Sequence, residues 1–526
     1  MAAFEKLFLE NTSLTFDGMR MFGRRIITDN FEPNELTVVE FQQILKDSLE
    51  IHAKNVKEIQ YLYDYVKGNQ PILYRTNKEV RPEINNKSVE NWAKVVLKFK
   101  LGFLYGEPIQ LIKNSNKGVN LLKKAKSLDE TTIDEQVMLL NDYYQEVDKH
   151  QADKECGFWT ITCGVGYECI LPTKEKDAIT PFEVFSLDPR YTYIIYSNSI
   201  RKQPLMAITY SINNADDPNK TTIDFVAYTE NRIYTATVNR EIEMLKFDVL
   251  PNILGVIPII EFNYDDLRQG GFEPALSLLD NINLICSDRM NDVQQAVQWF
   301  IKFINVDIDE EMYEKFKAKG AIVVKGEPGN PPQVEVVSSA LNQTQIQTFK
   351  DDMIKCLCVI TNIPERGANP SGNTGQALII GKGWADAEAD AQDVEVGLRK
   401  GQKKLLKIAI AISKLNSNVP NSIKDTLIET IDIKFTRNRS DNLLIKTQAL
   451  RTMLDAGVAP ILAFKICGLF DDPQKAYELS KETLDMFYLN NKNKNNTDQI
   501  PNQGKGEIDP EDSEHNQLME SISNKK

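Results

Sequence analysis

Three long segments with helical periodicity, separated by an insert and by a loop, constrain this chain most. Apolar residues recur at steps of three and four over residues 273–303, 342–362 and 374–415, as in an amphipathic helix. The first segment has about 30 residues and would extend roughly 45 Å. The second carries one narrow apolar seam, made of Ile346, Phe349, Met353, Leu357 and Ile360. Two such helices with an insert at their far end predict a stalk, whose remaining faces need partners from outside the chain.

The insert between the first two segments departs from this period. Residues 305–341 contain a short helical stretch, "EEMYEKFKAKG", and two strand-like runs, "AIVVKG" and "VEVVSS", separated by a Pro/Gly turn. β-Branched runs bounded by turn residues favour strands. The insert is therefore predicted to be a small α/β element.

Three helices are predicted ahead of the stalk. Helical periodicity covers residues 37–66, which end before Gly68, and residues 88–105, for which Ser88 is a suitable N-cap. A third helix is expected over residues 129–157, because its start is rich in acids that favour a helix N-terminus.

Short runs of β-branched and aromatic residues follow between residues 158 and 263, separated by turn clusters such as "NNADDPN". They predict a mainly antiparallel sheet flanked by the early helices, and hence an α+β fold. A strand is expected at 430–437 and helices at 440–487. Residues 1–40 read as an arm, and the Asn- and charge-rich tail from Asn490 predicts disorder.

The segment "NPSGNTGQALIIG", residues 369–381, interrupts the helical region. A phosphate-binding loop would need a glycine where Gln376 stands and a hydroxyl where Gly383 stands. The segment also follows a helix, so no strand–turn–helix would direct backbone amides at a phosphate. A pliant loop between two helices is the better interpretation.

The third helical segment separates its charges. "WADAEADAQDVEV" holds five acids and no base, whereas "GLRKGQKKLLK" holds five bases and no acid. Glycines at 381, 383, 397 and 401 lower helix stability and are candidates for kinks. The segment is therefore predicted to be a long, bent helix.

Residues suited to catalysis or metal binding are sparse. The chain has 3 histidines, and no hydrolase, metalloprotease or kinase motif occurs. Its 7 cysteines include Cys163 and Cys169 in strand-like sequence and the pair Cys356 and Cys358 on a helix, a poor chelate. The acids at 386–395 could hold a hard cation, but a solvated face is the commoner role of such a run. No metal, cofactor or enzymatic activity is predicted.

Composition narrows the remaining classes of partner. A net charge of −13 argues against a protein that coats DNA or an anionic membrane. The chain shows no secretory signal and no apolar run of membrane-spanning length. Seven cysteines in a long chain do not form the pattern of a disulfide framework.

Blocks from residue 50 to residue 470 resemble the portal proteins of tailed bacteriophages, in particular the SPP1-like siphophage branch. They include "NNKSVENWAKVVLKFKLGFLYGEPIQL", "FEVFSLDPRYTYIIYSN", "FEPALSLLDNINLICSDRMNDVQQAVQWFIKF", "KDDMIKCLCVITNIPERG", "SGNTGQALIIG" and "IDIKFTRNRSDN".

The resemblance implies a portal fold with an α/β wing, a long-helix stem, a small α/β clip, a kinked tunnel helix and an α-helical crown. Carried over by block, it divides the chain into an N-terminal arm (1–40), wing (40–267), first stem helix (268–304), clip (305–341), second stem helix (342–364), tunnel loop (365–377), tunnel helix (378–415), return strand (416–437), crown (438–487) and disordered tail (488–526).

The resemblance also implies a site without catalytic residues. The tunnel loop would contact DNA through Arg366, Asn369, Ser371, Gly372, Asn373, Thr374, Gly375 and Gln376. Charges of the channel or of the subunit interface would be Lys350, Lys355, Asp386, Glu388, Asp390, Asp393, Glu395, Arg399, Lys400, Lys403 and Lys404. Whether the acids at 386–395 face the lumen, or pair with the basic patch of a neighbouring subunit, stays open.

The implied partners are those of a capsid vertex. They are about eleven further copies in a cyclic ring, double-stranded DNA, the terminase large subunit, the head–tail connector or adaptor, and the major capsid and scaffolding proteins, without a membrane. The protein would be assembled in the host bacterial cytoplasm and reside in the virion. Two alternatives are a non-viral ring-forming scaffold protein without DNA, and an enzyme with a metal-bound acidic site.

Overall fold

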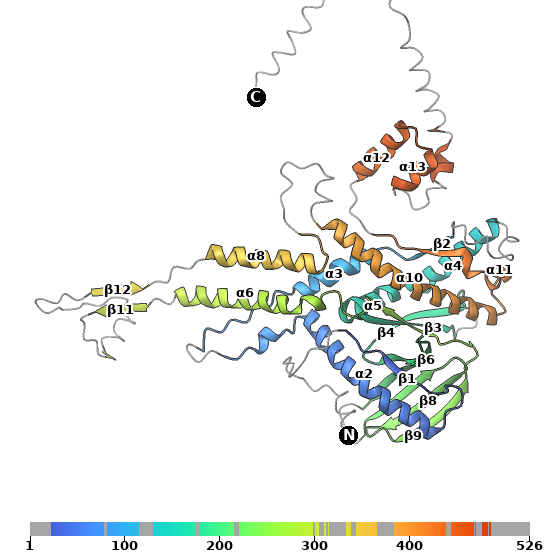
Figure 1. Cartoon of the computed structure of the whole chain (residues 1–526), viewed down its shortest axis with the longest axis horizontal. Coiled ribbons are helices and arrows are strands. Elements are labelled where there is room, and N and C mark those ends of the chain that lie inside the picture. Colours follow the sequence, from blue (N-terminus) through green and yellow to red (C-terminus); the bar gives the residue numbers. More distant parts are fainter. Residues whose placement is uncertain are drawn as a thin grey trace, which may run out of the picture. The chain divides into compact units, whose positions relative to one another are not determined.

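The computed structural model divides into two compact units, Met1–Asn438 and Arg439–Lys526, which are described separately (Figure 1). Helices and mainly antiparallel sheets both build the first unit, so the predicted α+β class is confirmed. The structure describes residues 23–77, 82–114, 130–174, 178–214, 220–297, 300–304, 310–311, 314, 333–337, 343–365, 383–437, 443–467, 469, 476–481 and 483–484.

Helix α2, Val38–Lys67, has the ends that its sequence predicts. Thr37 accepts a hydrogen bond from the Glu40 backbone N–H while the Glu40 carboxylate accepts one from the Thr37 N–H, which completes a capping box. Gly68 ends the helix in the left-handed region at φ 99°. The predicted helix over 37–66 is therefore confirmed.

Helix α2 covers one face of a six-stranded sheet (Figure 1). All neighbouring strands are antiparallel except β1 and β5, which are parallel. Phe41, Leu45 and Leu49 of α2 form a core with alternate residues of the sheet, including Phe225 and Tyr234. The strands in spatial order are β1 (Ile27–Asp29), β5 (Thr192–Ser197), β6 (Pro204–Asn213), β7 (Thr222–Tyr228), β8 (Arg232–Asn239) and β9 (Met244–Pro251).

Strand β1 shows that part of the predicted arm belongs to the body. The neighbouring Arg24 side chain is buried and forms ion pairs with Glu273 at 2.6 Å and with Glu58 at 3.3 Å. Burial raises the pKa of Glu58, and Arg24 opposes that shift. A strand of three residues is too short for a periodic pattern, which explains why the arm was predicted to extend to residue 40.

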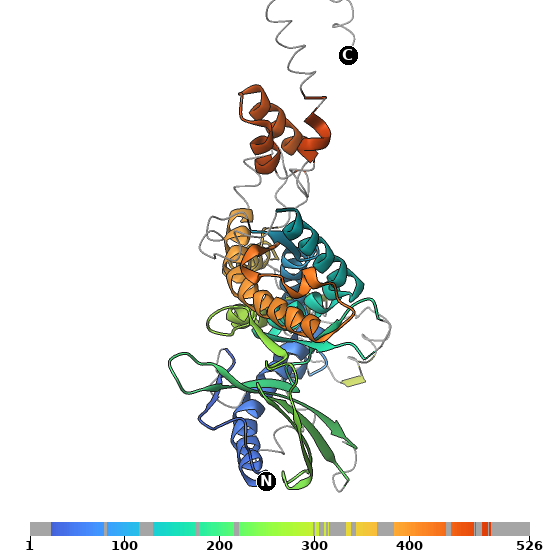
Figure 2. The ribbon, with the colours of Figure 1, turned by 90° about the vertical axis from the view of Figure 1, so that its right-hand side faces the viewer.

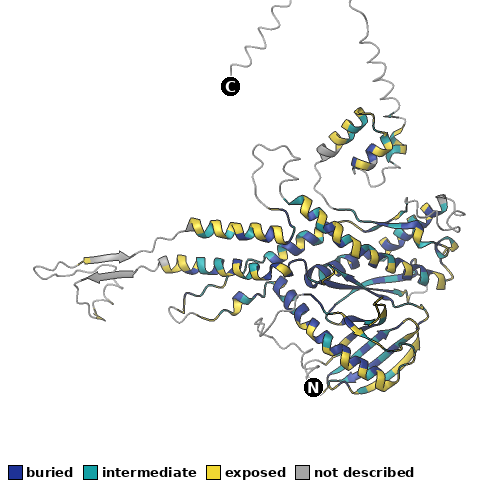
Figure 3. Ribbon diagram, viewed as in Figure 1, coloured by how far each residue is buried: buried dark blue, intermediate teal, exposed yellow. Residues whose placement is uncertain are grey.

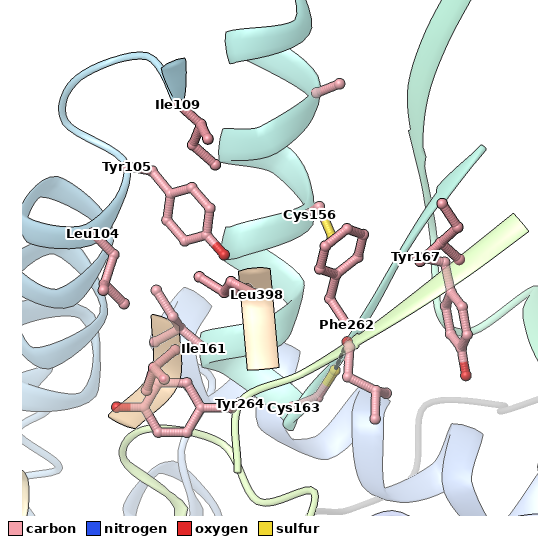
Figure 4. Close-up of a cluster of buried hydrophobic side chains, with 14 of the residues drawn as sticks. Leu104, Tyr105, Ile109, Cys156, Ile161, Cys163, Tyr167, Phe262, Tyr264 and Leu398 are labelled. Carbon is pink, nitrogen blue, oxygen red and sulfur yellow. Dashed lines mark hydrogen bonds between the residues drawn. The ribbon is translucent and has the colours of Figure 1, made fainter. Parts of the chain in front are cut away.

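A second core lies between a three-stranded sheet and several helices (Figure 2). Figure 4 shows Leu398 of α10 between Tyr105 and Phe262 in this core. Its sheet has the order β10 (Ile259–Asn263), β3 (Val165–Pro172) and β4 (Phe182–Leu187), and a separate ladder joins β13 (Ile431–Lys434) to β2 (Gln110–Lys113). The helices are α3 (Trp92–Leu104), α4 (Glu130–Glu146), α5 (Lys149–Cys163), α10 (Trp384–Leu415) and α11 (Asn421–Lys424).

The third predicted helix is in fact two helices. Asp148, at φ 50°, separates α4 from α5, and α5 continues to Cys163. Cys163 therefore ends a helix instead of lying in a strand, and β3 starts at Val165. The run "FWTITC" is β-branched and aromatic, but its packing in the second core overrides that local preference.

Helix α3 starts at Trp92 with Asn91 as its N-cap, and not at Ser88. The preceding residues form an extended strap along helix α6 (Leu276–Val297). The backbone N–H groups of Asn86, Ser88 and Glu90 donate to side chains of α6 at 2.7, 2.9 and 2.7 Å; these are Asn291, Ser287 and Asn283. The acceptors occur at every fourth residue of α6 and the donors at every second residue of the extended strap, so the two series lie side by side.

The stalk consists of α6, the antiparallel strands β11 (Phe300–Ile304) and β12 (Gln333–Val337), and α8 (Gln343–Ile360). Helix α6 ends at Val297, so the predicted helix over 273–303 is too long. The run "FIKFI" forms strand β11 and pairs with β12. The expected strand "AIVVKG" lies outside the described residues.

The apolar seam predicted on α8 is only partly turned inward. Met353 and Leu357 are buried, but Phe349 and Ile360 are 59% and 49% exposed. Figure 3 shows exposed residues along both stalk helices.

In the second unit the structure describes α12 (Leu443–Asp455) and α13 (Pro460–Cys467), within the range predicted to be helical. Ala463 and Phe464 are buried in this unit. The tail predicted to be disordered lies outside the described residues.

Burial of His52 predicts an acid-sensitive fold. Its ring is fully buried, stacks on Tyr193 with centroids 4.3 Å apart, and donates from Nε2 to the Arg190 carbonyl at 3.1 Å. Burial lowers the pKa of His52 to about 3. The unfolded chain therefore binds a proton that the folded chain does not, and stability falls as the pH drops below about 6.5, by about 1.4 kcal/mol per pH unit.

We expect His52→Gln to reduce the loss of unfolding free energy between pH 6.5 and pH 5, measured by urea denaturation. The partly buried His150 provides the control His150→Gln, which should change that slope less. An unchanged slope in His52→Gln would contradict the assignment.

Candidate functional site

The predicted DNA-contacting residues, Arg366 to Gln376, lie outside the described residues, but the structure shows where their loop is anchored. Helix α8 ends at Ile360 and α10 begins at Trp384. A Cβ placed on Gly383 would lie 3.6 Å from the carbonyl oxygen of Ile363 and from the Cα of Pro364. The chain thus leaves and returns at nearly the same point.

Asp390 joins three segments at this anchor. Its Oδ2 accepts hydrogen bonds from Lys100 Nζ at 2.7 Å and from the Tyr264 hydroxyl at 3.0 Å, and its Oδ1 accepts one from Asn362 at 3.2 Å. The Lys100 side chain is 4% exposed, and burial lowers its pKa while Asp390 opposes that shift. The carboxylate therefore connects α3, the end of β10 and the end of α8 to α10.

Trp384 adds an apolar contact beside this ion pair. Its ring lies 5.8 Å from the Phe99 ring and 6.2 Å from the Phe103 ring, both on α3. The first turn of α10 is thus held to α3 by aromatic packing as well as by charge.

Several charges of α10 that were predicted to face the channel or a neighbouring subunit have partners within the chain. Arg437 pairs with Glu388 at 2.7 Å and with Glu395 at 2.5 Å. Asp432 pairs with Arg399 at 2.9 Å and with Lys403 at 3.6 Å. Burial raises the pKa of Glu395, and Arg437 opposes that shift.

The pKa of Asp432 is lowered, whereas that of Glu395 is raised. Burial would raise the pKa of Asp432, but hydrogen bonds from the Ile433 N–H and from Arg399 lower it.

The remaining predicted charges fall into two groups. Lys350 of α8 forms an ion pair with Glu90 of the strap, and Cys286 donates to the same carboxylate oxygen at 3.0 Å. Lys355 is exposed and pairs with Asp352 at 3.7 Å. The exposed residues of the set on α10 are Asp386, Asp393, Lys400 and Lys404. Their roles in a channel or interface stay predictions.

Gly401 of α10, predicted as a candidate kink, has a packing role. A Cβ there would lie 2.3 Å from the ring of Phe262 on β10. The helix crosses the strand at this residue, and a side chain would separate them.

Metal binding finds no support in the described part of the chain, and most of the thiols there are buried. No group of three His, Cys, Asp or Glu side chains there could hold a metal ion. Cys356 is exposed and the other cysteines are buried. Burial raises the pKa of Cys163 and Cys169 to about 12. Among the described helices, none combines the length and the apolar character that a membrane span requires.

A family model for phage portal protein, SPP1 Gp6-like, matches residues 45–486. The chain belongs to this family. The resemblance expected over residues 50–470 is thereby confirmed. No curated protein matches the chain.

The contacts at the loop anchor could not be read from the sequence. Lys100 and Asp390 are 290 positions apart, and neither lies in a motif that singles it out. The charge runs were visible in the sequence, but a run does not reveal which of its members find partners.

We expect Asp390→Asn to lower the unfolding free energy by about 3 kcal/mol, because it leaves the buried Lys100 ammonium without its counter-charge. Asp386→Asn is the matched control on the same helix, and an exposed position should change stability by under about 0.5 kcal/mol. Urea denaturation at pH 7 measures both. Equal effects would contradict the role of Asp390 as an anchor.

Proposed function

We propose that the chain is the subunit of a phage portal, a ring at one capsid vertex through which double-stranded DNA is packaged and ejected. The observation that carries the proposal is the family match over residues 45–486. In this proposal the protein resides in the virion, is assembled in the bacterial cytoplasm, and has no enzymatic activity of its own.

The elements suit the parts of such a ring. The six-stranded sheet with α2 would form the wing, α6 and α8 the stem, β11 and β12 the clip, α10 the tunnel helix, and α12 with α13 the crown. The clip would meet the terminase large subunit and then the head–tail connector, and the wing would meet the capsid and scaffolding proteins.

Exposed apolar side chains on both stem helices support self-assembly. They are Leu284, Met290 and Val293 on α6, and Phe349, Val359 and Ile360 on α8. Large exposed apolar groups on a soluble protein mark contact surfaces. A cyclic ring needs two different, complementary surfaces on each subunit, and the two helices offer one each.

The tunnel loop would guide DNA without gripping it. Each phosphate that Lys or Arg neutralises adds salt-dependent affinity and therefore drag. The loop sequence offers Asn369, Asn373 and Gln376 for weak hydrogen bonds, Gly372 and Gly375 for compliance, and Arg366 as its one cation.

Electron microscopy of the purified chain, together with a DNA packaging assay, tests the function. Annular particles that support packaging are the expected result. Rings that never take up DNA would favour the scaffold alternative, and a monomer with divalent-dependent turnover would favour an enzyme.

We expect Cys356 to be labelled by a maleimide in the unassembled chain and protected in the ring, because it lies between Phe349 and Val359 on α8. It is exposed in the single chain, whereas the other cysteines are buried. Peptide mass mapping measures the labelling, and Cys356→Ser provides the background. Equal labelling before and after assembly would show that this face of α8 stays open.

We expect Asn373→Lys with Gln376→Lys to slow packaging without preventing ring formation, because two added cations per subunit would bind phosphates. Asn418→Lys, at an exposed residue after α10, is the matched control. Packaging at the normal rate in the loop variant would contradict the proposed role of the loop.

A further inference from the structure

Twelve residues of α10 are exposed, of which Ala385, Gln392, Lys414 and Leu415 follow no symmetrical spacing. The other eight are separated by steps of 3, 4, 3, 1, 3, 4 and 3 residues, a sequence that reads the same in both directions. They are Asp386, Ala389, Asp393, Val396, Gly397, Lys400, Lys404 and Lys407. Steps of three and four keep residues on one side of a helix, so this self-docking stripe is continuous.

The charges of the self-docking stripe reverse about its midpoint. Asp393 and Lys400 lie at equal distances on either side of the bond between Val396 and Gly397, about 5 Å along the axis. Asp386 and Lys407 lie about 16 Å away on either side. Within the described residues, the structure shows no ion pair or hydrogen bond for the side chains of these four residues. Glu388, Glu395 and Arg399, in contrast, have partners within the chain.

Such a pattern is complementary to itself when two helices run antiparallel. A two-fold axis through the midpoint sets Asp393 of each copy opposite Lys400 of the other, and Asp386 opposite Lys407. An interface of this kind uses the same surface on both copies. Near-heptad spacing also suits the small crossing angle of packed antiparallel helices.

At the midpoint, Val396 is 69% exposed. A Cβ on Gly397 would lie 3.6 Å from the Asn263 carbonyl oxygen, so this glycine also borders β10. Burial and the like-charged neighbours Lys400 and Lys407 lower the pKa of Lys404, and Glu261 of the same chain opposes that shift. Carboxylates from a second copy would relieve that repulsion.

We propose that the self-docking stripe binds a second copy of this chain, antiparallel, across a two-fold axis between Val396 and Gly397. A ring with cyclic symmetry alone contains no such axis. The pair therefore forms between chains that do not share a ring, as in a subunit before assembly. The inference stands independently of the proposed function.

Cysteine cross-linking tests the axis directly, in the full chain with Cys356→Ser to remove the exposed thiol. Val396→Cys places two thiols close to the axis, within the distance that a disulfide spans. Ala389→Cys is the matched control, because its two copies would lie about 22 Å apart along the helices. Under mild oxidation we expect about tenfold more covalent dimer from Val396→Cys than from Ala389→Cys, since a disulfide cannot bridge the longer distance.

Equal yields from the two cysteine variants, or none from either, would overturn the proposal whether or not rings form. A failure of ring formation together with a strong Val396→Cys dimer would overturn the proposed function and leave this inference intact.

Charge exchange supplies a second test. One variant carries Asp386→Lys and Asp393→Lys, and the other carries Lys400→Asp and Lys407→Asp. Each should lose the dimer in sedimentation velocity, and an equimolar mixture should recover it. All four positions are exposed, so thermal unfolding should stay close to that of the parent chain.

A nucleic acid on the lysine half is the competing occupant. Binding of a short DNA duplex that is lost only with Lys400→Asp and Lys407→Asp, without recovery of a dimer in the mixture, would overturn the self-docking stripe in favour of that occupant.

Discussion

The ion pair between Lys100 and Asp390 is the contact that fixes where α8 ends and α10 begins. A buried ammonium is costly unless a carboxylate accompanies it, so α3 and α10 cannot separate without exposing or stranding a charge. Tyr264 and Asn362 share the same carboxylate, which extends the constraint to β10 and to the end of α8. The ends of the segment that joins α8 to α10 are thereby held together.

Ion pairs also hold the rest of α10, the helix that begins at this anchor. The carboxylates and guanidinium groups on its flanks are paired with Arg437 and Asp432 of the segment that follows, and these pairs hold the helix to β13. What is left exposed is a stripe with acids at one end and lysines at the other. An acidic chain can thus present a local basic surface on one half of a helix.

Periodicity carried much of the fold. It located α2 and α8 within a few residues and the end of α10 at Leu415. β-Branched runs located most strands, because burial on one face imposes a period of 3.6 or 2 on the sequence. Periodicity failed where a short run of residues is compatible with both a helix and a strand. "FWTITC" is helical although it is β-branched, and "FIKFI" is a strand although it follows a helix, since in both cases the packing partner is remote in sequence. The site was less accessible: the loop was visible as a break in periodicity, but its anchor was not.

By itself the sequence determined the class of fold, the stalk and the division of charge along the third helical segment, because composition and spacing are local properties that survive without coordinates. The family followed from the resemblance of whole sequence blocks. Only the tertiary structure decided which charges are paired. Glu388 and Asp393 are equivalent as letters in one acidic run, yet one faces Arg437 and the other faces solvent. A charge is neutralised by whatever the fold brings within a few ångströms, and that neighbour is set by three-dimensional packing rather than by position in the chain.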